Sequence, residues 1–255
     1  MEVASASLEY RRWEPRTLTS PHPVSVWLLL HEGLGCVAGW RDFPQQLART
    51  TGRPVVAYSR VGYGRSSSTP LPRPPDFMLR EAVDTLPALI EALDLERPFL
   101  IGHSDGGTIA LMTAYTGSAS ISGVATLAAH VFNEPMCTNA IAMTGEKYRE
   151  GALRDALARY HPAQVDIAFW GWHDVWLSSA FRDWDITDEL GAAVLPILAI
   201  QGADDEYGSV GQLDAIAANV SGAERELLEE CGHAVHRDQP ERLIGMLEDF
   251  AHRRL

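Results

Sequence analysis

The 255-residue sequence contains no apolar run of about 18 residues, which is the length that a membrane-spanning helix needs. Its first residues are not a basic segment followed by an apolar one, so we expect no signal peptide. Cysteine is scarce, and the odd, scattered set Cys36, Cys137 and Cys231 indicates free thiols in a reducing compartment. Together these absences argue against a membrane-spanning or disulfide-stabilised protein and favour a cytoplasmic one.

Positive charge is also in short supply. The chain has 21 Lys and Arg against 34 Asp and Glu, for a formal net charge of −13. Such a chain repels phosphate backbones and anionic lipid surfaces, so we expect a small-molecule substrate and neither nucleic acid nor a membrane as partner. The remaining composition, 46% hydrophobic and 22% charged, is typical of a globular protein, and the length suits one α/β domain with an insertion. No feature of the sequence indicates an oligomeric state.

The most informative stretch is residues 102–107, Gly-His-Ser-Asp-Gly-Gly, which stands between two apolar runs. A buried strand that meets a Gly-flanked Ser and turns at once into a helix is typical of a nucleophile elbow, which holds Ser104 at a helix N-terminus. The Gly residues fit because the turn is tight and leaves no room for a Cβ atom. Gly-x-Ser-x-Gly by itself is a weak signal, so the prediction depends on whether a base and an acid accompany Ser104.

Two later strands carry the partners that a Ser nucleophile requires. The apolar residues 194–200 lead to Asp204 and Asp205, and residues 226–230 lead into His233. Ser, acid and His therefore each follow a predicted strand, in the chain order expected of a triad built on an elbow. Adjacent residues in an extended segment point to opposite sides, so only one of the two carboxylates can reach His233.

A Gly-rich loop upstream supplies a candidate oxyanion site. Residues 24–30 form a predicted strand that runs into residues 31–35, His-Glu-Gly-Leu-Gly. A backbone N–H of this loop, together with the N–H of Asp105, can bind a developing oxyanion. Gly33 is the expected donor by position, and Leu34 is the alternative.

Together, these residues resemble the α/β-hydrolase superfamily over nearly the whole chain. The resemblance includes residues 59–66, Ser-Arg-Val-Gly-Tyr-Gly-Arg-Ser, which look like the family's Gly-x-Gly-x-Ser loop with Ser59 where an Asp is common. The His-Glu-Gly loop departs from the more usual His-Gly, and we expect the carboxylate of Glu32 to point away from the oxyanion. The family's acid usually lies three residues after the loop Gly, which implies Asp205 rather than Asp204 as the triad acid.

The resemblance implies an α/β-hydrolase fold with a mostly parallel central sheet, helices on both faces and a helical cap. It also implies a serine hydrolase without metal or cofactor, in which Ser104 attacks an acyl carbon, His233 moves the proton and Asp205 orients the imidazole. The expected substrate is a small, largely apolar ester, thioester or lactone. A C–C bond hydrolase acting on a β-diketone, and a non-catalytic binding protein on the same fold, remain as alternatives.

The order of predicted elements agrees with this fold. Strands alternate with helical patterns, which indicates a parallel sheet covered by helices on both faces. The helix expected over residues 79–93 contains Pro87 and should be kinked there. Residues 132–190 contain no strand pattern and are rich in Trp, Tyr and Phe. We therefore expect a core of residues 1–131 and 191–255 and a helical cap of residues 132–190 over an apolar pocket.

Several other side chains bear on the site. His233 and His236 have His-x-x-His spacing, but a metal there would leave the Ser elbow unexplained, so no metal is expected and His236 is placed at the pocket rim. His31 is expected to hold the oxyanion loop by hydrogen bonds. No cluster of Lys or Arg accompanies the motifs, which favours an uncharged substrate unless Arg60 and Arg65 reach the site and clamp an anion.

Overall fold

The computed structural model describes residues 1–3, 6–15 and 26–255, and its centre is a seven-stranded sheet. The strands lie in the order β3-β5-β4-β6-β7-β8-β9; β3 pairs antiparallel with β5, and the other neighbours are parallel. The strands are β3 (Tyr10–Trp13), β4 (Trp27–Leu30), β5 (Val55–Tyr58), β6 (Phe99–His103), β7 (Gly123–Leu127), β8 (Ile197–Gly202) and β9 (Glu224–Leu228). A separate antiparallel pair is β1 (Glu2–Val3) and β2 (Ala6–Ser7). The mostly parallel sheet agrees with the architecture expected from the sequence.

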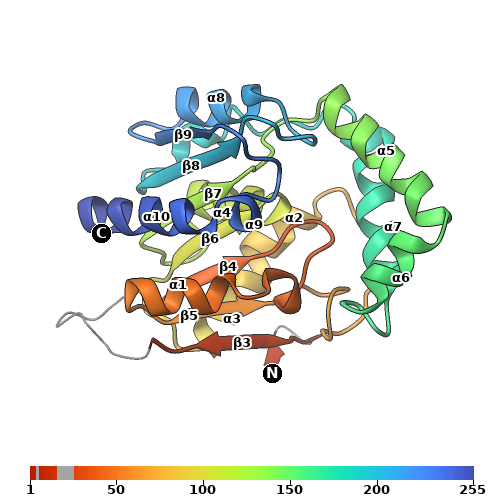
Figure 1. Cartoon of the computed structure of the whole chain (residues 1–255), viewed down its shortest axis with the longest axis horizontal. Helices are drawn as coiled ribbons and strands as arrows, with labels where there is room; N and C mark the ends of the chain where they lie inside the picture. The colour runs from red at the N-terminus through yellow and green to blue at the C-terminus, as the bar shows by residue number, and fades with distance from the viewer. Residues whose placement is uncertain (4–5, 16–25) are drawn as a thin grey trace.

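The strands feed two hydrophobic cores because successive side chains of a strand point to opposite faces of the sheet. In β4, Trp27 and Leu29 join one core and Leu28 and Leu30 the other, and all four are buried. The helices that share the core of Leu28 include α2 (Phe77–Arg80), α3 (Leu86–Ala92), α4 (Asp105–Thr116) and α8 (Val210–Asn219). The other core includes η1 (Val37–Trp40), α1 (Phe43–Thr51), α9 (Val235–Asp238) and α10 (Pro240–Arg254). With both faces covered (Figure 1), the carboxyl ends of the parallel strands are where a site can form.

The strands that carry the motifs are present, with their ends shifted by a few residues from the expected ones. The strand expected over residues 24–30 is β4, although residues 24 and 25 lie outside the described part of the chain. Those expected over residues 194–200 and 226–230 are β8 and β9. The motif residues therefore follow strands β4, β6, β8 and β9, which belong to one sheet.

The helix expected over residues 79–93 is interrupted. A π-helical turn, η2 (Glu81–Thr85), separates α2 from α3 shortly before Pro87. Pro87 has no backbone N–H to donate to the preceding turn, and a wider turn accommodates that gap. Among the residues that the structure describes, every helix is too short or too polar to span a bilayer.

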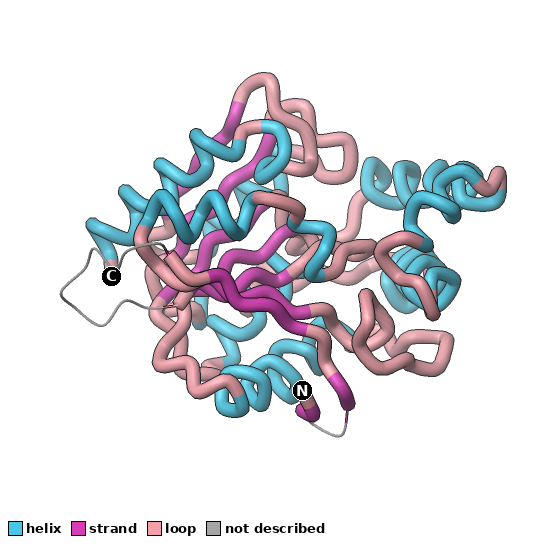
Figure 2. The backbone as a smooth tube through the Cα atoms, turned by 60° about the horizontal axis from the view of Figure 1, so that its bottom comes forward, coloured by secondary structure: helices cyan, strands magenta, loops and turns pink. Residues whose placement is uncertain are grey.

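Residues 132–190 form helices that lie beyond the carboxyl ends of the parallel strands (Figure 1). They are α5 (Pro135–Arg149), α6 (Ala152–Ala158), α7 (Val165–Trp176) and η3 (Ser179–Phe181), and the short η4 (Leu190–Ala192) leads back to β8. Figure 2 shows the strands running toward these helices, with loops between. Tyr148 stacks on Phe169 with ring centroids 3.6 Å apart, so some of the aromatic residues in this segment join α5 to α7. The segment is helical, as its sequence predicts.

Candidate active site

Ser104 stands at the turn between β6 and α4, where its backbone adopts φ 52° and ψ −120°. A positive φ is uncommon outside Gly, and it is typical of the strained elbow that lifts a Ser hydroxyl off the end of a strand. Two glycines allow the turn, because a Cβ atom on Gly102 would meet the backbone of Gly106 and one on Gly106 would meet the carbonyl of Leu30. The hydroxyl is thus presented at the N-terminus of α4, where free N–H groups favour negative charge.

His233 and Asp205 come from the loops after β9 and β8, and their side chains are hydrogen bonded. Nδ1 of His233 lies 2.8 Å from Oδ1 and 3.0 Å from Oδ2 of Asp205. An ionised carboxylate only accepts, so Nδ1 carries the hydrogen and Nε2 is the nitrogen that can accept a proton. Asp205 is buried, whereas the neighbouring Asp204 is exposed. The structure therefore brings Asp205, and not Asp204, to His233.

The loop after β8 fixes Asp205 through several donors. The backbone N–H groups of Tyr207 and Gly208 donate to Oδ1 over 2.8 and 3.2 Å, and Gln201 Nε2 donates to Oδ2 over 3.3 Å. Burial by itself would raise the pKa of Asp205, but the hydrogen bond and charge of His233, and the Tyr207 N–H, lower it below its usual range. Asp205 is therefore an anion at neutral pH, which is the state that orients an imidazole.

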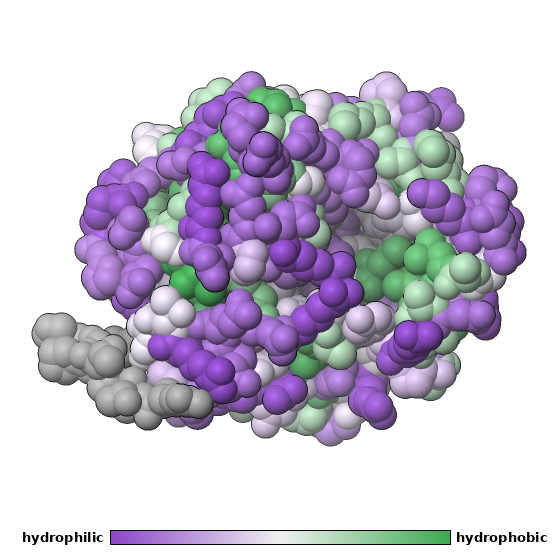
Figure 3. Space-filling view, in the orientation of Figure 1, coloured by the Kyte–Doolittle hydropathy of each residue, from purple (hydrophilic) through white to green (hydrophobic). Residues whose placement is uncertain are grey.

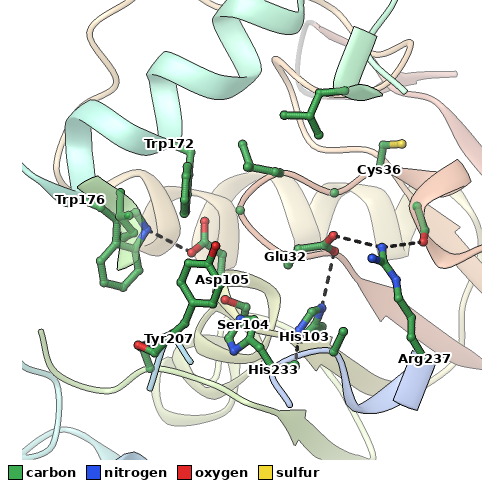
Figure 4. A pocket seen from close by; sticks show the side chains of 18 of the residues that line it. Glu32, Cys36, His103, Ser104, Asp105, Trp172, Trp176, Tyr207, His233 and Arg237 are labelled. Carbon is green, nitrogen blue, oxygen red and sulfur yellow. Dashed lines mark hydrogen bonds and ion pairs between the residues drawn. The ribbon is translucent and has the colours of Figure 1, made fainter. Parts of the chain in front are cut away.

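Ser104 and His233 both line one cavity of about 290 Å³ (Figure 4). This volume is at the lower end of the range for ligand pockets. The wall toward α5, α6 and α7 includes Ile141, Leu157 and Trp172. Figure 3 shows a hollow beside these helices with hydrophobic residues on its floor. The cavity therefore suits a small ligand with an apolar portion.

Charged side chains line another part of the wall. Glu32 is turned toward His103 and Arg237, with Oε2 3.6 Å from His103 Nδ1 and Oε1 3.8 Å from Arg237 Nη2 (Figure 4). Burial by itself would raise the pKa of Glu32, but contact with His103 holds it well below its usual range. Glu206 and Arg41 also line the cavity. The cavity thus carries both signs of charge, and the Glu32 carboxylate already has basic partners.

Arg60 and Arg65 do not form the anion clamp considered for them. Arg60 is buried and donates to backbone carbonyls of the loop after β4, whereas the side chain of Arg65 is exposed. Neither side chain is part of the cavity wall. The arginines that do line the cavity are Arg41 and Arg237, which no motif marked in the sequence.

The oxyanion candidates Gly33, Leu34 and Asp105 all line the cavity that holds Ser104. Gly33 packs against the indole of Trp172, and a Cβ atom at this position would collide with the ring. Asp105 is the first residue of α4, so its N–H has no acceptor within the helix and can serve a ligand. Lining the cavity does not by itself distinguish the Gly33 N–H from that of Leu34.

His31 and His236 are buried and do not line the cavity. His31 is buried, and its ring nitrogens lie 2.7 Å from the Glu32 carbonyl and 3.0 Å from the Arg60 N–H, so it holds the loop as expected. His236 was expected at the pocket rim, and this is wrong: it is buried, with its ring centroid 4.7 Å from that of Trp40. Among the described residues, no group of three or more His, Cys, Asp and Glu side chains is arranged to hold a metal ion.

Sequence reasoning missed two supporting side chains. Ser59, where the resemblance led us to expect an Asp, donates through Oγ to Glu9 Oε2 over 2.7 Å, so Glu9 supplies a carboxylate at this place. The Tyr207 ring is tilted against that of His233, with the centroids 4.9 Å apart, and the Tyr207 hydroxyl lies 3.0 Å from Thr144 Oγ1 in α5. The contacts of Ser59 with Glu9 and of Tyr207 with Thr144 join residues 50 and 63 positions apart, and no local pattern marks either.

The sequence matches the model of the alpha/beta hydrolase family over residues 27–245. This chain belongs to the alpha/beta hydrolase family. Membership confirms the expected fold class and the expected class of enzyme, a hydrolase. A Ser elbow, a triad and an oxyanion hole are typical of the family.

Similarity to individual proteins extends over most of this alpha/beta hydrolase. It is 26% identical to a proline iminopeptidase of Lactobacillus crispatus over 98% of each chain. It is 22% identical to a 2-hydroxy-6-oxo-6-phenylhexa-2,4-dienoate hydrolase of Burkholderia cepacia over 88% of this chain and 86% of that one. Its fold resembles the crystal structure of an enol-lactonase from Burkholderia xenovorans, with a TM-score of 0.75 and 18% identity over 98% of each chain. The three proteins bear different names, so the fold alone does not select a substrate.

Proposed function

We propose that this alpha/beta hydrolase is a serine hydrolase that cleaves the ester, thioester or lactone bond of a small, largely apolar substrate. Ser104, His233 and Asp205 form its catalytic triad, and the N–H groups of Gly33 and Asp105 form its oxyanion hole. The observation that carries this proposal is the 2.8 Å contact between His233 Nδ1 and Asp205 Oδ1, next to a cavity that also holds Ser104.

The reaction proceeds through an acyl-enzyme. Ser104 Oγ attacks the acyl carbon while His233 Nε2 takes its proton, and the two N–H groups bind the resulting oxyanion. The intermediate collapses, and the leaving alcohol or thiol takes the proton from His233. Water then attacks the acyl-enzyme, giving a proton to His233 and forming a second oxyanion. Collapse of this intermediate releases the carboxylic acid, and Ser104 regains its proton from His233.

We further propose that residues 132–190 are a cap and that residues 1–131 and 191–255 are the core. The helices of the cap supply the apolar part of the cavity wall, including Leu157 and Trp172. An acyl chain placed against them would bury apolar surface while its carbonyl lies at Ser104. The small volume of the cavity limits such a chain to modest length.

The charges in the cavity favour an uncharged substrate. An anionic group would meet the carboxylates of Glu32 and Glu206, while one of the two arginines at the wall, Arg237, lies 3.8 Å from Glu32. The test is kcat/KM for neutral and anionic esters of equal length at low and high salt. We expect the neutral ester to be preferred; a preference for the anionic ester that weakens as salt rises would show that Arg41 and Arg237 bind the substrate.

A proline iminopeptidase activity is the second candidate. The iminopeptidase of L. crispatus matches nearly the whole chain, and the carboxylates of Glu32 and Glu206 at the cavity could hold a protonated amine. The same triad would serve, because amides and esters pass through similar tetrahedral intermediates. Cleavage of a C–C bond in a β-diketone remains the third candidate, with the B. cepacia hydrolase as the similar protein.

A substrate panel separates the candidates. Short-chain aryl esters, a lactone, the p-nitroanilide of L-proline and a dicarbonyl ring-cleavage product are compared by kcat/KM with the purified protein. The proposal predicts the highest value for an ester or the lactone. The highest value for the proline anilide or the dicarbonyl compound would establish the second or third candidate instead. Turnover of none of them, with no reaction with a fluorophosphonate, would indicate a non-catalytic binding protein.

A further inference from the structure

The carbonyl of Glu32, in the loop after β4, accepts hydrogen bonds from three groups. Arg60 Nη2 donates to it over 3.0 Å, the Gly35 N–H over 3.1 Å, and His31 Nδ1 lies 2.7 Å away. The tautomer of His31 follows from its other nitrogen, because the backbone N–H of Arg60 donates to Nε2 over 3.0 Å. Nε2 is therefore an acceptor and Nδ1 carries the hydrogen. All three partners are donors, and they hold the carbonyl toward Arg60.

The direction of this carbonyl sets the direction of the next N–H. The Glu32–Gly33 peptide is trans, and in a trans peptide the N–H points opposite to the C=O. With the Glu32 carbonyl drawn toward Arg60, the Gly33 N–H points away from Arg60, and Gly33 lines the cavity. The argument does not extend to Leu34: among the described residues no donor holds the Gly33 carbonyl, so nothing fixes the Leu34 N–H in the same way.

The same guanidinium reaches the residue that supplies the second N–H. Arg60 Nη2 lies 3.6 Å from Asp105 Oδ2, and both side chains are buried, with exposed fractions of 3% and 1%. On its other side, Asp105 accepts a hydrogen bond from Trp176 Nε1 over 3.2 Å. Arg60 also donates through Nη1 to the carbonyl of His31. One buried cation thus connects the loop after β4 to the first residue of α4.

The environment keeps Arg60 charged and fixed. Burial by itself would lower its pKa, but the neighbouring Tyr63 and Asp105 raise it above its ordinary value. Its Cζ atom lies 5.0 Å from the centre of the Tyr63 ring, which holds one face of the guanidinium. A planar group with donors in fixed directions can bind two carbonyls and a carboxylate at once, and a Lys ammonium cannot reproduce this pattern.

We propose that Arg60 is the positioning residue of the oxyanion hole: it aligns the Gly33 N–H and the first turn of α4 at Asp105, and it makes Gly33 rather than Leu34 the donor in the loop. This inference rests on the proposed function, because it assumes that an oxyanion forms at Ser104. Arg60 touches no part of the cavity, so it acts through the backbone and not on the substrate.

Arg60→Met and Arg60→Lys test this role, with Arg73→Met as the matched control. Arg73 packs on the same Tyr63 ring, with Cζ 4.3 Å from its centre, but its buried Nε and Nη2 atoms have no hydrogen-bond partner among the described residues. We expect Arg60→Met to lower kcat by about 10- to 100-fold. This loss is smaller than the one expected from deleting an oxyanion donor altogether. KM should change less than about threefold. The kcat of Arg60→Lys should lie between those of the wild-type protein and Arg60→Met, and Arg73→Met should keep the wild-type kcat.

Affinity for a trifluoromethyl ketone, which forms a tetrahedral adduct with the Ser, gives a second readout. Binding of this compound should weaken in step with kcat, while binding of the unreacted substrate should not. If Arg60→Met is unfolded by circular dichroism, Arg60→Lys decides. Wild-type kcat in the folded Arg60 variant, or equal losses for the ketone and the substrate, would overturn the inference. Failure of the premise taken from the proposed function is distinguishable, because a wild-type protein in which Ser104 is no nucleophile would not react with the ketone or with a fluorophosphonate at all.

Discussion

The cavity has two walls that are built differently. On the side of the sheet, polar groups are tied by hydrogen bonds, as between Asp205 and His233 and between Arg60 and the loop after β4. On the side of α5, α6 and α7, side chains such as Ile141 and Leu157 can touch a ligand only through apolar contact. A polar network holds atoms in fixed directions, whereas an apolar wall adapts to different shapes. We therefore expect the sheet side to set the rate of the chemical step and the helical side to select the substrate.

The two walls meet at a few polar contacts. Trp176 in α7 donates a hydrogen bond to Asp105. The hydroxyl of Tyr207, in the loop after β8, lies 3.0 Å from Thr144 Oγ1 in α5. His161, between α6 and α7, has Nε2 3.0 Å from a carbonyl of the loop after β4. These contacts hold the helices over the site. Substitutions on each wall test whether the sheet side sets the rate and the helical side selects the substrate.

The largest effect should come from Ser104→Ala on the sheet side. Without the hydroxyl no acyl-enzyme forms, and triad members fail as a unit, so kcat should fall by roughly 10⁴-fold or more. The thermal midpoint and the binding of a substrate analogue should stay close to those of the wild-type protein. Steady-state kinetics with the best ester of the panel measures the loss. A variant that keeps more than a few per cent of the rate would remove Ser104 from its proposed role.

Asp205→Asn should come next, and Asp204→Asn is its matched control. The Asn amide can donate to His233, which favours the wrong tautomer, so kcat should fall by about 10³- to 10⁴-fold. Asp204 is exposed and its change should cost less than about threefold. Comparison of kcat for the two variants is the measurement. A larger loss in Asp204→Asn would mean that the wrong carboxylate has been assigned.

A substitution on the helical side should show the other half of the comparison. Leu157→Ala removes apolar contact at the cavity and should raise KM roughly fivefold, for a loss of about 1 kcal/mol, with kcat nearly unchanged. Leu153→Ala, on the same helix but away from the cavity, is the control and should leave KM unchanged. The two parameters are measured with esters of increasing acyl length. A fall in kcat as large as that of a sheet-side variant would show that the helical side also sets the rate of the chemical step.

The smallest effect concerns stability near the junction of the walls, where the His130 ring lies 5.3 Å from that of Trp176. Burial and the neighbouring His233 lower the pKa of His130 from 6.5 to about 4. The unfolded chain then binds more protons than the folded one between these values, so the free energy of unfolding falls as pH drops from about 6.5 toward 4. His130→Gln should weaken this dependence.

Urea unfolding between about pH 7 and pH 5 measures the slope, and the exposed His252→Gln is the control. The control should follow the wild-type protein. Equal slopes for His130→Gln and the wild type would show that His130 does not contribute in this pH range. The lowered pKa of Asp205 acts in the same direction at lower pH, since stability from that carboxylate is lost as pH falls through its folded pKa.

The parts of this structure that the sequence predicted are those encoded by short spacings. The turn at Ser104 needs Gly on both sides, and the resemblance to the α/β-hydrolase superfamily implied Asp205 rather than Asp204 from its position after the loop Gly; both features lie within a few residues. The alternation of apolar residues likewise marks the strands, because a strand has a fixed period of two. The fold class and the contact between Asp205 and His233 could therefore be predicted from the sequence.

The parts that could not be predicted depend on pairs that are distant along the chain. Glu9 reaches Ser59 across 50 positions, and its carboxylate replaces one that the loop lacks. Arg60 was considered as part of an anion clamp at the site, but its guanidinium donates to buried carbonyls of the loop after β4 instead. His236 was placed wrongly because its spacing from His233 says nothing about Trp40, against which it packs. Tertiary contacts of this kind leave no local pattern.

Mass spectrometry of the protein after reaction with a fluorophosphonate tests the central claim most directly. The account predicts one phosphonyl group per chain, on the peptide that contains Ser104, and faster labelling of the wild-type protein than of Asp205→Asn. Ser104→Ala should remain unlabelled under the same conditions. No label on the folded wild-type protein, or a label on a different residue that persists in Ser104→Ala, would contradict the assignment of Ser104 as the nucleophile.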